Sequence, residues 1–299
     1  MSRITIFIVL ISLSSAIAYT EVTRRINFRT EGDIEFIFYS EEKEVAKQIV
    51  DRSSGTIIKT TGEIPDGIVK QYYESGKLMV EWNYKDNRLE GISRRYYESG
   101  KLMIEWNYRG GRLEGISRRY YESGNLWSEW NYKEGRREGI SNEYYQSGEL
   151  MIVWNYKDGR KEGISKEYYK SGKLKADLNH KEDKLDGRSI SYYESGNLMG
   201  EADYKEGELE GIVKKYYEKG KLIWESNYKG GKLEGMSKQY YESGNLKAEI
   251  NYKDGEKDGI TTHYYEDGRI KGTENYVKGY RYEIKKKSTD VNDKLDLHP

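Results

Sequence analysis

The chain has 299 residues and equal numbers of basic and acidic side chains (51 each), so its formal net charge is zero. This balance argues against a nucleic-acid-binding protein, which usually carries a marked basic excess. Cysteine is absent, which excludes disulfides, thiolate metal sites and a lipid anchor on cysteine. The 30 tyrosines and 32 glycines are typical of thin β-structure with many tight turns.

Residues 1–18 have the features of an export signal. Arg3 supplies a positive start, residues 4–18 form an apolar run, and Ala16-Ile17-Ala18 is a cleavage site of the small-residue type. The run is short for a transmembrane helix, which needs about 20 apolar residues, although an uncleaved membrane anchor is the alternative. We therefore expect cleavage after Ala18 and an exported protein in the periplasm, on the outer surface or secreted.

Residues 19–66 differ in composition from the rest of the chain and predict a small N-terminal cap with a lead-in segment. Residues 26–39 are strand-like and residues 41–50 are helix-like, followed by Ser53-Ser54-Gly55. A cap in this place would shield the edge of the first following hairpin, because an exposed sheet edge invites edge-to-edge association.

A period of 24 residues dominates residues 67–282. A tyrosine pair returns nine times in register, without insertion or deletion. A fixed period of roughly 20–50 residues indicates a repeat architecture, and such arrays present extended binding surfaces. The pattern therefore favours a binding or scaffolding protein. The first tyrosines of the pairs are Tyr72, Tyr96, Tyr120, Tyr144, Tyr168, Tyr192, Tyr216, Tyr240 and Tyr264.

Each 24-residue unit has the pattern of a β-hairpin. In the unit 91–114, residues 92–97 and 102–108 are rich in β-branched and aromatic side chains, and the turn signal Ser99-Gly100 lies between them. Gly110-Gly111 is a second turn signal that leads to the next unit. Nine such hairpins predict an all-β fold, an elongated array of antiparallel hairpins with about 18 strands.

The register of the hairpin has two solutions. If Ser75-Gly76 is a two-residue turn, Lys70 faces Glu81, and most other units repeat this pairing of opposite charges. If the glycine lies in a bulged three-residue loop, Ile68 and Tyr72 share a face with apolar residues of the second strand. We favour the bulge, because it gives the cleaner apolar face and a buried face usually fixes register. The apolar residues of the second strand are Leu78, Val80 and Trp82.

The turns between units contain a recurrent glycine and a recurrent acidic residue. Asn87 and Asp183 replace the glycine in two units, which predicts a positive φ because Asn and Asp tolerate the left-handed backbone best. We expect the acidic residue to accept backbone N–H bonds in the turn, with binding of Ca²⁺ or of a cationic partner as the alternative. The acidic residues are Asp66, Glu90, Glu114, Glu138, Glu162, Asp186, Glu210, Glu234 and Asp258.

These units resemble the MORN repeat (membrane occupation and recognition nexus), in particular its bacterial variant. The resemblance rests on YYESGKL at residues 72–78, on YYESGNL beginning at Tyr120, Tyr192 and Tyr240, and on the acidic-Gly step of every unit. It covers about seven-tenths of the chain. It implies an antitoxin role for bacterial members and lipid association for eukaryotic ones. The export signal disfavours a cytoplasmic antitoxin.

The resemblance also brings a lipid-kinase label, because some plant lipid kinases carry MORN repeats. The chain contains neither G-x-x-x-x-G-K-[ST] nor G-x-G-x-x-G, so no kinase part is expected. Its three histidines are scattered and form no metal-binding spacing. We therefore predict no enzymatic activity, no cofactor and no metal site.

Stacked hairpins would align the aromatic side chains into ladders. Two ladders follow the tyrosine pairs, and a third runs through Tyr84, Tyr108 and their equivalents. Such ladders could stack sugar rings or hold a quaternary ammonium group, or they could pack on each other to stabilise a thin sheet. If two ladders lie on opposite faces, one can be structural while the other binds.

Tryptophan and arginine give the candidate binding residues. One column holds tryptophan in the first four units and Leu178, Ala202, Ser226, Ile250 and Glu274 in the others. This stripe is either a partner site, since Trp and Tyr dominate interface hot spots, or a better-packed N-terminal core. A basic cluster beside it could meet phosphate or anionic lipid headgroups, or pair with carboxylates across the hairpin. The candidates are Trp82, Trp106, Trp130, Trp154, Arg94, Arg95, Arg118 and Arg119.

The sequence thus predicts an exported, non-enzymatic repeat protein that binds another protein or the cell surface through aromatic ladders. A module that binds glycans or lipid headgroups at the cell envelope is one alternative. An antitoxin-like component of a toxin–antitoxin pair is another. Residues 283–299 are charged and polar and predict a C-terminal tail.

Overall fold

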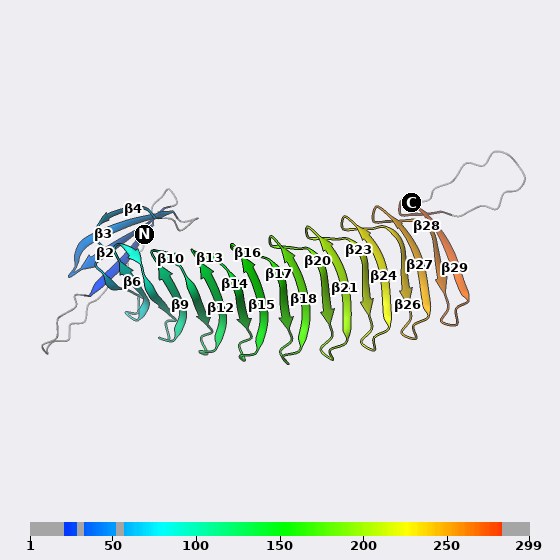
Figure 1. The fold of residues 1–299 in the computed structure, drawn as a ribbon, viewed down its shortest axis with the longest axis horizontal. Coiled ribbons are helices and arrows are strands. Elements are labelled where there is room, and N and C mark those ends of the chain that lie inside the picture. Colours follow the sequence, from blue (N-terminus) through cyan, green and yellow to red (C-terminus); the bar gives the residue numbers. More distant parts are fainter. Residues whose placement is uncertain (1–20, 29–32, 52–56, 283–299) are drawn as a thin grey trace, which may run out of the picture. The chain divides into compact units, whose positions relative to one another are not determined.

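The computed structural model describes residues 21–28, 33–51 and 57–282 of the chain, and all its regular elements are β-strands (Figure 1). The prediction of an all-β fold is confirmed. Within these ranges there is no helix of the length and apolarity needed to cross a membrane. The export-signal segment, Ser53-Ser54-Gly55 and the tail 283–299 lie outside the described residues. The chain divides into two compact units, unit 1 (residues 1–148) and unit 2 (residues 149–299).

The cap of unit 1 is built from four strands. These strands, β1 (Val22–Phe28), β2 (Asp33–Ser40), β3 (Lys43–Asp51) and β4 (Ile57–Gly62), pair antiparallel in chain order. β1 also pairs in parallel with β5 (Gly67–Tyr72), the first strand of the first repeat. β1 therefore covers the edge that the first hairpin would otherwise expose.

The prediction of a helix over residues 41–50 is wrong, because this segment forms most of β3. Its lysines, glutamates and alanine favour a helix, but its burial follows a period of two, with Ala46 and Gln48 both 3% exposed. Pairing with β2 and β4 on both edges satisfies its backbone groups. The core of the cap forms around the fully buried Phe38, whose ring packs nearly perpendicular to that of Tyr84 from the first repeat.

Each repeat contributes a third, short strand that the sequence does not predict. β6 (Leu78–Lys85) forms the expected hairpin with β5, and β7 (Arg88–Leu89) then folds back onto the end of β6. β8 (Gly91–Tyr96), the first strand of the next repeat, pairs with the same edge of β6 as β7. Between the eighth and ninth repeats, the short strand of one and the first strand of the next form a single strand, β28 (Glu256–Tyr264).

The remaining strands of both units follow the same order. Those of unit 1 are β9 (Leu102–Arg109), β10 (Arg112–Leu113), β11 (Gly115–Tyr120), β12 (Leu126–Lys133), β13 (Arg136–Arg137) and β14 (Gly139–Tyr144). Those of unit 2 are β15 (Leu150–Lys157), β16 (Arg160–Lys161), β17 (Gly163–Tyr168), β18 (Leu174–Lys181), β19 (Lys184–Leu185), β20 (Gly187–Tyr192), β21 (Leu198–Lys205), β22 (Glu208–Leu209), β23 (Gly211–Tyr216), β24 (Leu222–Lys229), β25 (Lys232–Leu233), β26 (Gly235–Tyr240), β27 (Leu246–Lys253), β28, β29 (Ile270–Val277) and β30 (Tyr280–Tyr282).

The hairpin register combines both predicted alternatives. The loop is the bulged one, because the N–H of Tyr73 donates to the carbonyl of Lys77 at 2.8 Å and the N–H of Gly76 donates to Tyr73 at 2.9 Å. A second bulge between Gln71 and Tyr72 then shifts the pairing by one residue. The strand bodies therefore adopt the charge-paired register, with Lys70 opposite Glu81.

The second bulge also overturns the predicted apolar face. Ile68 lies opposite Asn83 and is 55% exposed, whereas Val69 lies opposite Trp82 and is fully buried. A shift of one residue moves every side chain of a strand to the other face, so Ile68 leaves the face that carries the tryptophan. The predicted positive φ is confirmed for Asn87 (+61°) and Asp183 (+70°).

A buried serine supports the bend between the short strand and the following long strand. The N–H of Glu90 donates to Asn83 O at 2.9 Å, and the next main-chain pairing of the two strands places Arg94 opposite Glu81. Residues 91–93 therefore bulge out of the ladder between these two points. The N–H of Asn83 consequently has no main-chain partner there, and it donates to Oγ of the fully buried Ser93 at 3.1 Å. The same bond recurs for Ser117, Ser141 and Ser189.

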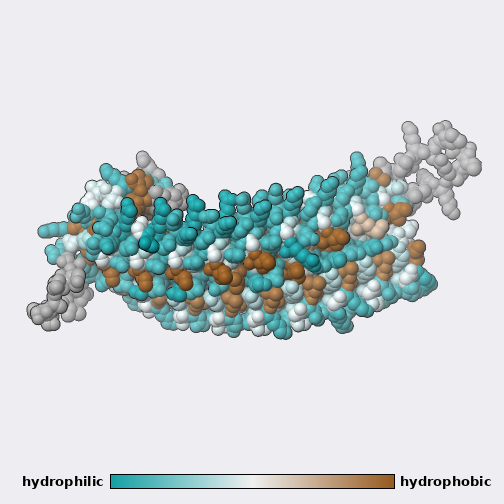
Figure 2. Space-filling model, in the orientation of Figure 1, coloured by the Kyte–Doolittle hydropathy of each residue, from teal (hydrophilic) through white to brown (hydrophobic). Residues whose placement is uncertain are grey.

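The two faces of the repeat sheet differ in character. The serine face carries the buried serine, the tryptophan stripe and the second-strand tyrosine, which are Ser93, Trp106 and Tyr108 in the second repeat. The isoleucine face carries Ile92 and the ion pair of Arg94 with Glu105. Figure 2 shows apolar side chains that recur on the visible surface of the repeats.

Candidate functional site

The hydroxyls of both tyrosine ladders bind to neighbouring repeats. On the isoleucine face, Tyr96 donates to the carboxylate of Glu81 in the preceding repeat at 2.8 Å. Tyr97 donates to the carbonyl of Tyr120 in the following repeat, also at 2.8 Å. Equivalent bonds recur within both units, so these hydroxyls join the repeats to one another. The first type includes Tyr216–Glu201, Tyr240–Glu225 and Tyr264–Glu249, and the second includes Tyr73–Tyr96, Tyr121–Tyr144, Tyr169–Tyr192, Tyr193–Tyr216, Tyr217–Tyr240 and Tyr241–Tyr264.

These hydrogen bonds predict that the stability of the fold decreases at alkaline pH. Burial, followed by the hydrogen bond to Glu81, raises the pKa of Tyr96 from 10.0 to about 12, and Tyr240 beside Glu225 behaves in the same way. A raised phenol pKa stabilises the fold fully below the unfolded pKa of 10.0, and this stabilisation is lost as the pH rises through about 12. We expect the melting temperature to fall in this window. Spectrophotometric titration should show tyrosines that ionise only there, and ionisation of every tyrosine near its ordinary pKa would contradict the ladder.

The acidic residue before the opening glycine accepts a backbone N–H in at least eight of the nine repeats, as expected. Glu90 Oε2 accepts from Gly110 at 2.7 Å, and Glu114 Oε2 accepts from Glu134 at 2.8 Å. The donor lies 20 residues further along the chain, in the next turn, so each carboxylate links two successive turns. Asp66, Glu162, Asp186, Glu210, Glu234 and Asp258 make the same bond. In the described part of the chain, no group of three or more His, Asp or Glu residues could hold a metal ion.

The predicted tryptophan stripe lies on the serine face, in contact with other side chains of the fold. Trp82 and Trp106 stack with ring centroids 5.3 Å apart and an angle of 13° between the planes. The guanidinium of Arg24, from β1 of the cap, lies 4.7 Å from the centroid of the Trp82 ring. In unit 1 the guanidinium of Arg137 lies 4.7 Å from the centroid of the Trp130 ring. These rings are therefore part of the packing of unit 1.

Trp154 belongs to unit 2 and has its own contacts there. The ammonium of Lys161 lies 3.6 Å from the centroid of its ring, and the ring of His180 approaches it at 6.1 Å with an angle of 68° between the planes. A cation close to an indole face is a stabilising cation–π contact. Trp154 thus packs against residues of unit 2.

Two of the four candidate arginines pair with carboxylates across the hairpin, which was one of the two predicted alternatives. Arg94 and Arg118 lie on the isoleucine face, where they pair with Glu105 at 2.9 Å and with Glu129 at 2.8 Å. Arg95 and Arg119 are the next residues along each strand and therefore lie on the serine face. The guanidinium of Arg119 lies 3.8 Å from the centroid of the Trp127 ring. Strand alternation thus divides the cluster between two faces.

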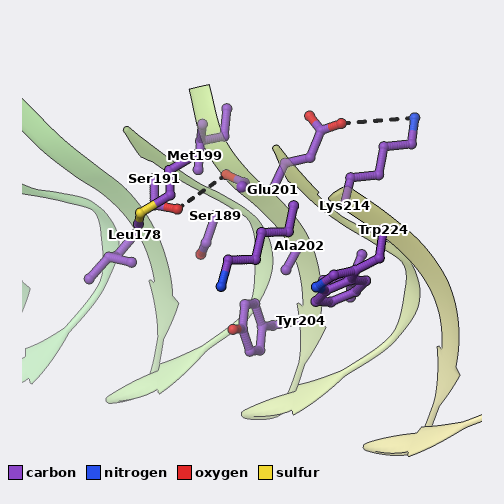
Figure 3. A pocket seen from close by; sticks show the side chains of 13 residues that line it. Leu178, Ser189, Ser191, Met199, Glu201, Ala202, Tyr204, Lys214 and Trp224 are labelled. Carbon is purple, nitrogen blue, oxygen red and sulfur yellow. Dashed lines mark hydrogen bonds and ion pairs between the residues drawn. The ribbon is translucent and has the colours of Figure 1, made fainter. Parts of the chain in front are cut away.

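A pocket that the sequence did not predict opens on the serine face of unit 2 (Figure 3). It has a volume of about 230 Å³ and lies at the sixth repeat, where the tryptophan column holds Ala202. Leu178, Met199 and the rings of Tyr204 and Trp224 line it. The loss of bulk at position 202 is visible in the sequence. The neighbours that enclose the space are known only from the fold.

The family model described as MORN repeat variant matches the chain nine times and covers most of both units, and no curated protein matches the chain. The matched residues are 65–86, 89–109, 113–134, 137–158, 161–182, 185–206, 209–229, 233–254 and 257–278.

Proposed function

The chain belongs to the MORN repeat variant family, and from this we propose that it is a non-enzymatic scaffold that binds a protein partner through the isoleucine face of its repeats. MORN repeats are consistent with a scaffold role because each copy repeats the same surface, and a partner can contact several copies at once. The observation that carries the proposal is a row of exposed isoleucines at one position of the repeat.

This row is continuous in unit 1, where the isoleucines of four successive repeats are 43–62% exposed. Each lies in the first strand of its repeat, close to the ion pairs and half-exposed tyrosine rings of the same face. Recurrent exposed apolar side chains with polar neighbours are typical of interaction surfaces. The isoleucines are Ile68, Ile92, Ile116 and Ile140 in unit 1, and Ile164, Ile212, Met236 and Ile260 hold the same position in unit 2.

The tyrosine ladder beside the row supports the same face. The rings of Tyr96 and its equivalents remain partly exposed, although their hydroxyls are bound to glutamates. Tyrosine rings held in one orientation lose little entropy when a partner contacts them, which favours their use in recognition. By contrast, the tryptophans of unit 1 already stack on residues of their own unit.

The proposed location of this scaffold is outside the cytoplasm, on the strength of the apolar run and the Ala16-Ile17-Ala18 motif. Cell fractionation with N-terminal sequencing tests this directly. A mature chain that begins at Tyr19 supports export. An intact Met1 in the cytoplasm would instead favour the antitoxin-like role.

The face itself is tested by the double change Ile92→Ser, Ile116→Ser. We expect the melting temperature to stay nearly unchanged, because exposed substitutions usually cost less than about 1 kcal/mol in total. Binding to a partner identified by crosslinking in the envelope should weaken by more than about tenfold, as for two interface anchors. The change Glu98→Ser, Glu122→Ser, in exposed loops of the same repeats, is the matched control. Unaltered binding by the isoleucine variant would exclude this face.

A further inference from the structure

The pocket of unit 2 exists because the sixth repeat lacks bulk at two neighbouring positions. Ala202 stands in the column that holds tryptophan in unit 1, and Gly200 stands where unit 1 has Val80, Ile104 and Ser128. Both residues lie on the serine face, since they pair with Ser189 and Ser191 across the hairpin. The space left open is therefore the place where an aromatic ring of this column would lie.

The walls of the pocket suit a planar apolar group. Trp224 and Tyr204 present aromatic rings, and Leu178 lies across the opening from Trp224 (Figure 3). A dry cavity of about 150 Å³ suffices for benzene, so about 230 Å³ accommodates a ring with a short polar substituent. Aromatic walls favour an aromatic ligand, because offset stacking and edge contacts add to the burial of apolar surface.

The charge at the pocket is positive. Lys215 lies between Gly200 and Trp224 in the sheet, on the serine face, and it is exposed. No ion pair engages it within the described residues, and neither of its cross-strand neighbours is acidic. The other charged side chains at the pocket, Glu201 and Lys214, pair with each other and point to the opposite side of the sheet (Figure 3). An ammonium group without a partner, beside an apolar cavity, selects for an anionic group and against a cationic one.

We propose that this pocket binds a carboxylate ligand that bears an aromatic ring. The ring lies between Leu178 and Trp224 above Ala202, and the carboxylate lies beside the ammonium of Lys215. The ligand is either a free aromatic acid or the C-terminal residue of a peptide, since both present the same two groups. The site lies on the serine face and does not depend on the scaffold role of the isoleucine face.

Calorimetric titration of the full chain with N-acetyl-tryptophan tests the site, with the neutral N-acetyl-tryptophanamide as the comparator. We expect one site per chain with a Kd on the order of 0.1 mM for the acid, and binding of the amide about tenfold weaker. Equal affinity for acid and amide, or binding of neither, would overturn the proposal. The peptide Gly-Gly-Trp then separates the two sources, because tighter binding than the acid identifies a peptide terminus and weaker binding identifies a free acid.

Two variants locate the binding site. Ala202→Trp restores the residue that unit 1 carries in this column, so it should fill the pocket and abolish binding of N-acetyl-tryptophan while the melting temperature stays the same or rises. Lys215→Gln should reduce the affinity for the acid to that of the amide. Because Lys215 is exposed, this substitution should leave the fold intact, so a loss of affinity reports on binding alone. Lys214→Gln, on the opposite face, is the matched control and should bind as the unaltered chain does. Unaltered binding by Ala202→Trp would place the ligand elsewhere and contradict the proposal.

Discussion

Gly62→Ala is expected to destabilise the N-terminal cap by more than about 4 kcal/mol, whereas Gly76→Ala should cost only about 1–2 kcal/mol. Both glycines have a φ of +80°, so both variants carry the same penalty for a side chain in the left-handed region. They differ in what the new Cβ would meet. At Gly62 it would lie 2.2 Å from the carbonyl oxygen of Val45, and at Gly76 no atom lies within 4 Å.

The clash at Gly62 is with main chain, which cannot move aside without breaking the pairing of β3 with β4. Urea unfolding followed by tryptophan fluorescence measures the effect, because Arg24 of the cap lies over the ring of Trp82. Loss of the cap would also free the edge of β5, so the Gly62 variant should associate in size-exclusion chromatography. Equal costs for the two variants would show that the close approach to Val45 is absent.

The double change Trp106→Ala, Trp130→Ala should lower the free energy of unfolding of the tryptophan-bearing repeats by about 4 kcal/mol. Truncation of a fully buried tryptophan to alanine usually lowers the free energy of unfolding by about 3–5 kcal/mol. Trp106 and Trp130 are only half-buried, so we expect each truncation to cost about half of that. The stacking of Trp106 on Trp82 and the contact of Arg137 with Trp130 disappear together. Urea unfolding monitored by circular dichroism provides the measurement.

The Ile92→Ser, Ile116→Ser variant is the natural comparison, since it alters the same two hairpins on the opposite face. We expect stability to separate from binding, with the tryptophan pair affecting melting and the isoleucine pair affecting the partner. If the tryptophan variant melts normally and loses its partner, the stripe is the recognition surface. The isoleucine face would then be only the solvent side of the sheet.

Much of the fold could be predicted from the sequence, because the same local signals recur in nine copies. The 24-residue period defined the long strands, the loop at Gly76 and the turn at Asn87. The role of the acidic residues also followed from local chemistry, although their bonds reach the next turn. In the cap, where nothing repeats, the composition of residues 41–50 pointed to a helix and pairing on both edges produced a strand.

The candidate site could be predicted less well, since it depends on which face each side chain occupies. The sequence identified Arg94 and Arg95 as neighbours, and the fold separates them on opposite faces of one strand. It identified Ala202 as a lost tryptophan, and the fold turns that loss into a pocket by placing Trp224 of the next repeat beside it. Contacts between repeats leave no recognisable pattern in the sequence of a single repeat.

The repeat, its strands and its turns could therefore be derived from the sequence, because propensity, glycine positions and the 24-residue period act within one repeat. The face on which each side chain lies depends instead on how the strands pair in the folded chain. The decisive feature is the bulge between Gln71 and Tyr72, which shifts the strands by one residue and moves Ile68 to the solvent side. A second irregularity, at residues 91–93, is supported by Ser93, whose hydroxyl binds the N–H of Asn83 in the preceding repeat. Because that bond joins two repeats, it forms only when they are stacked.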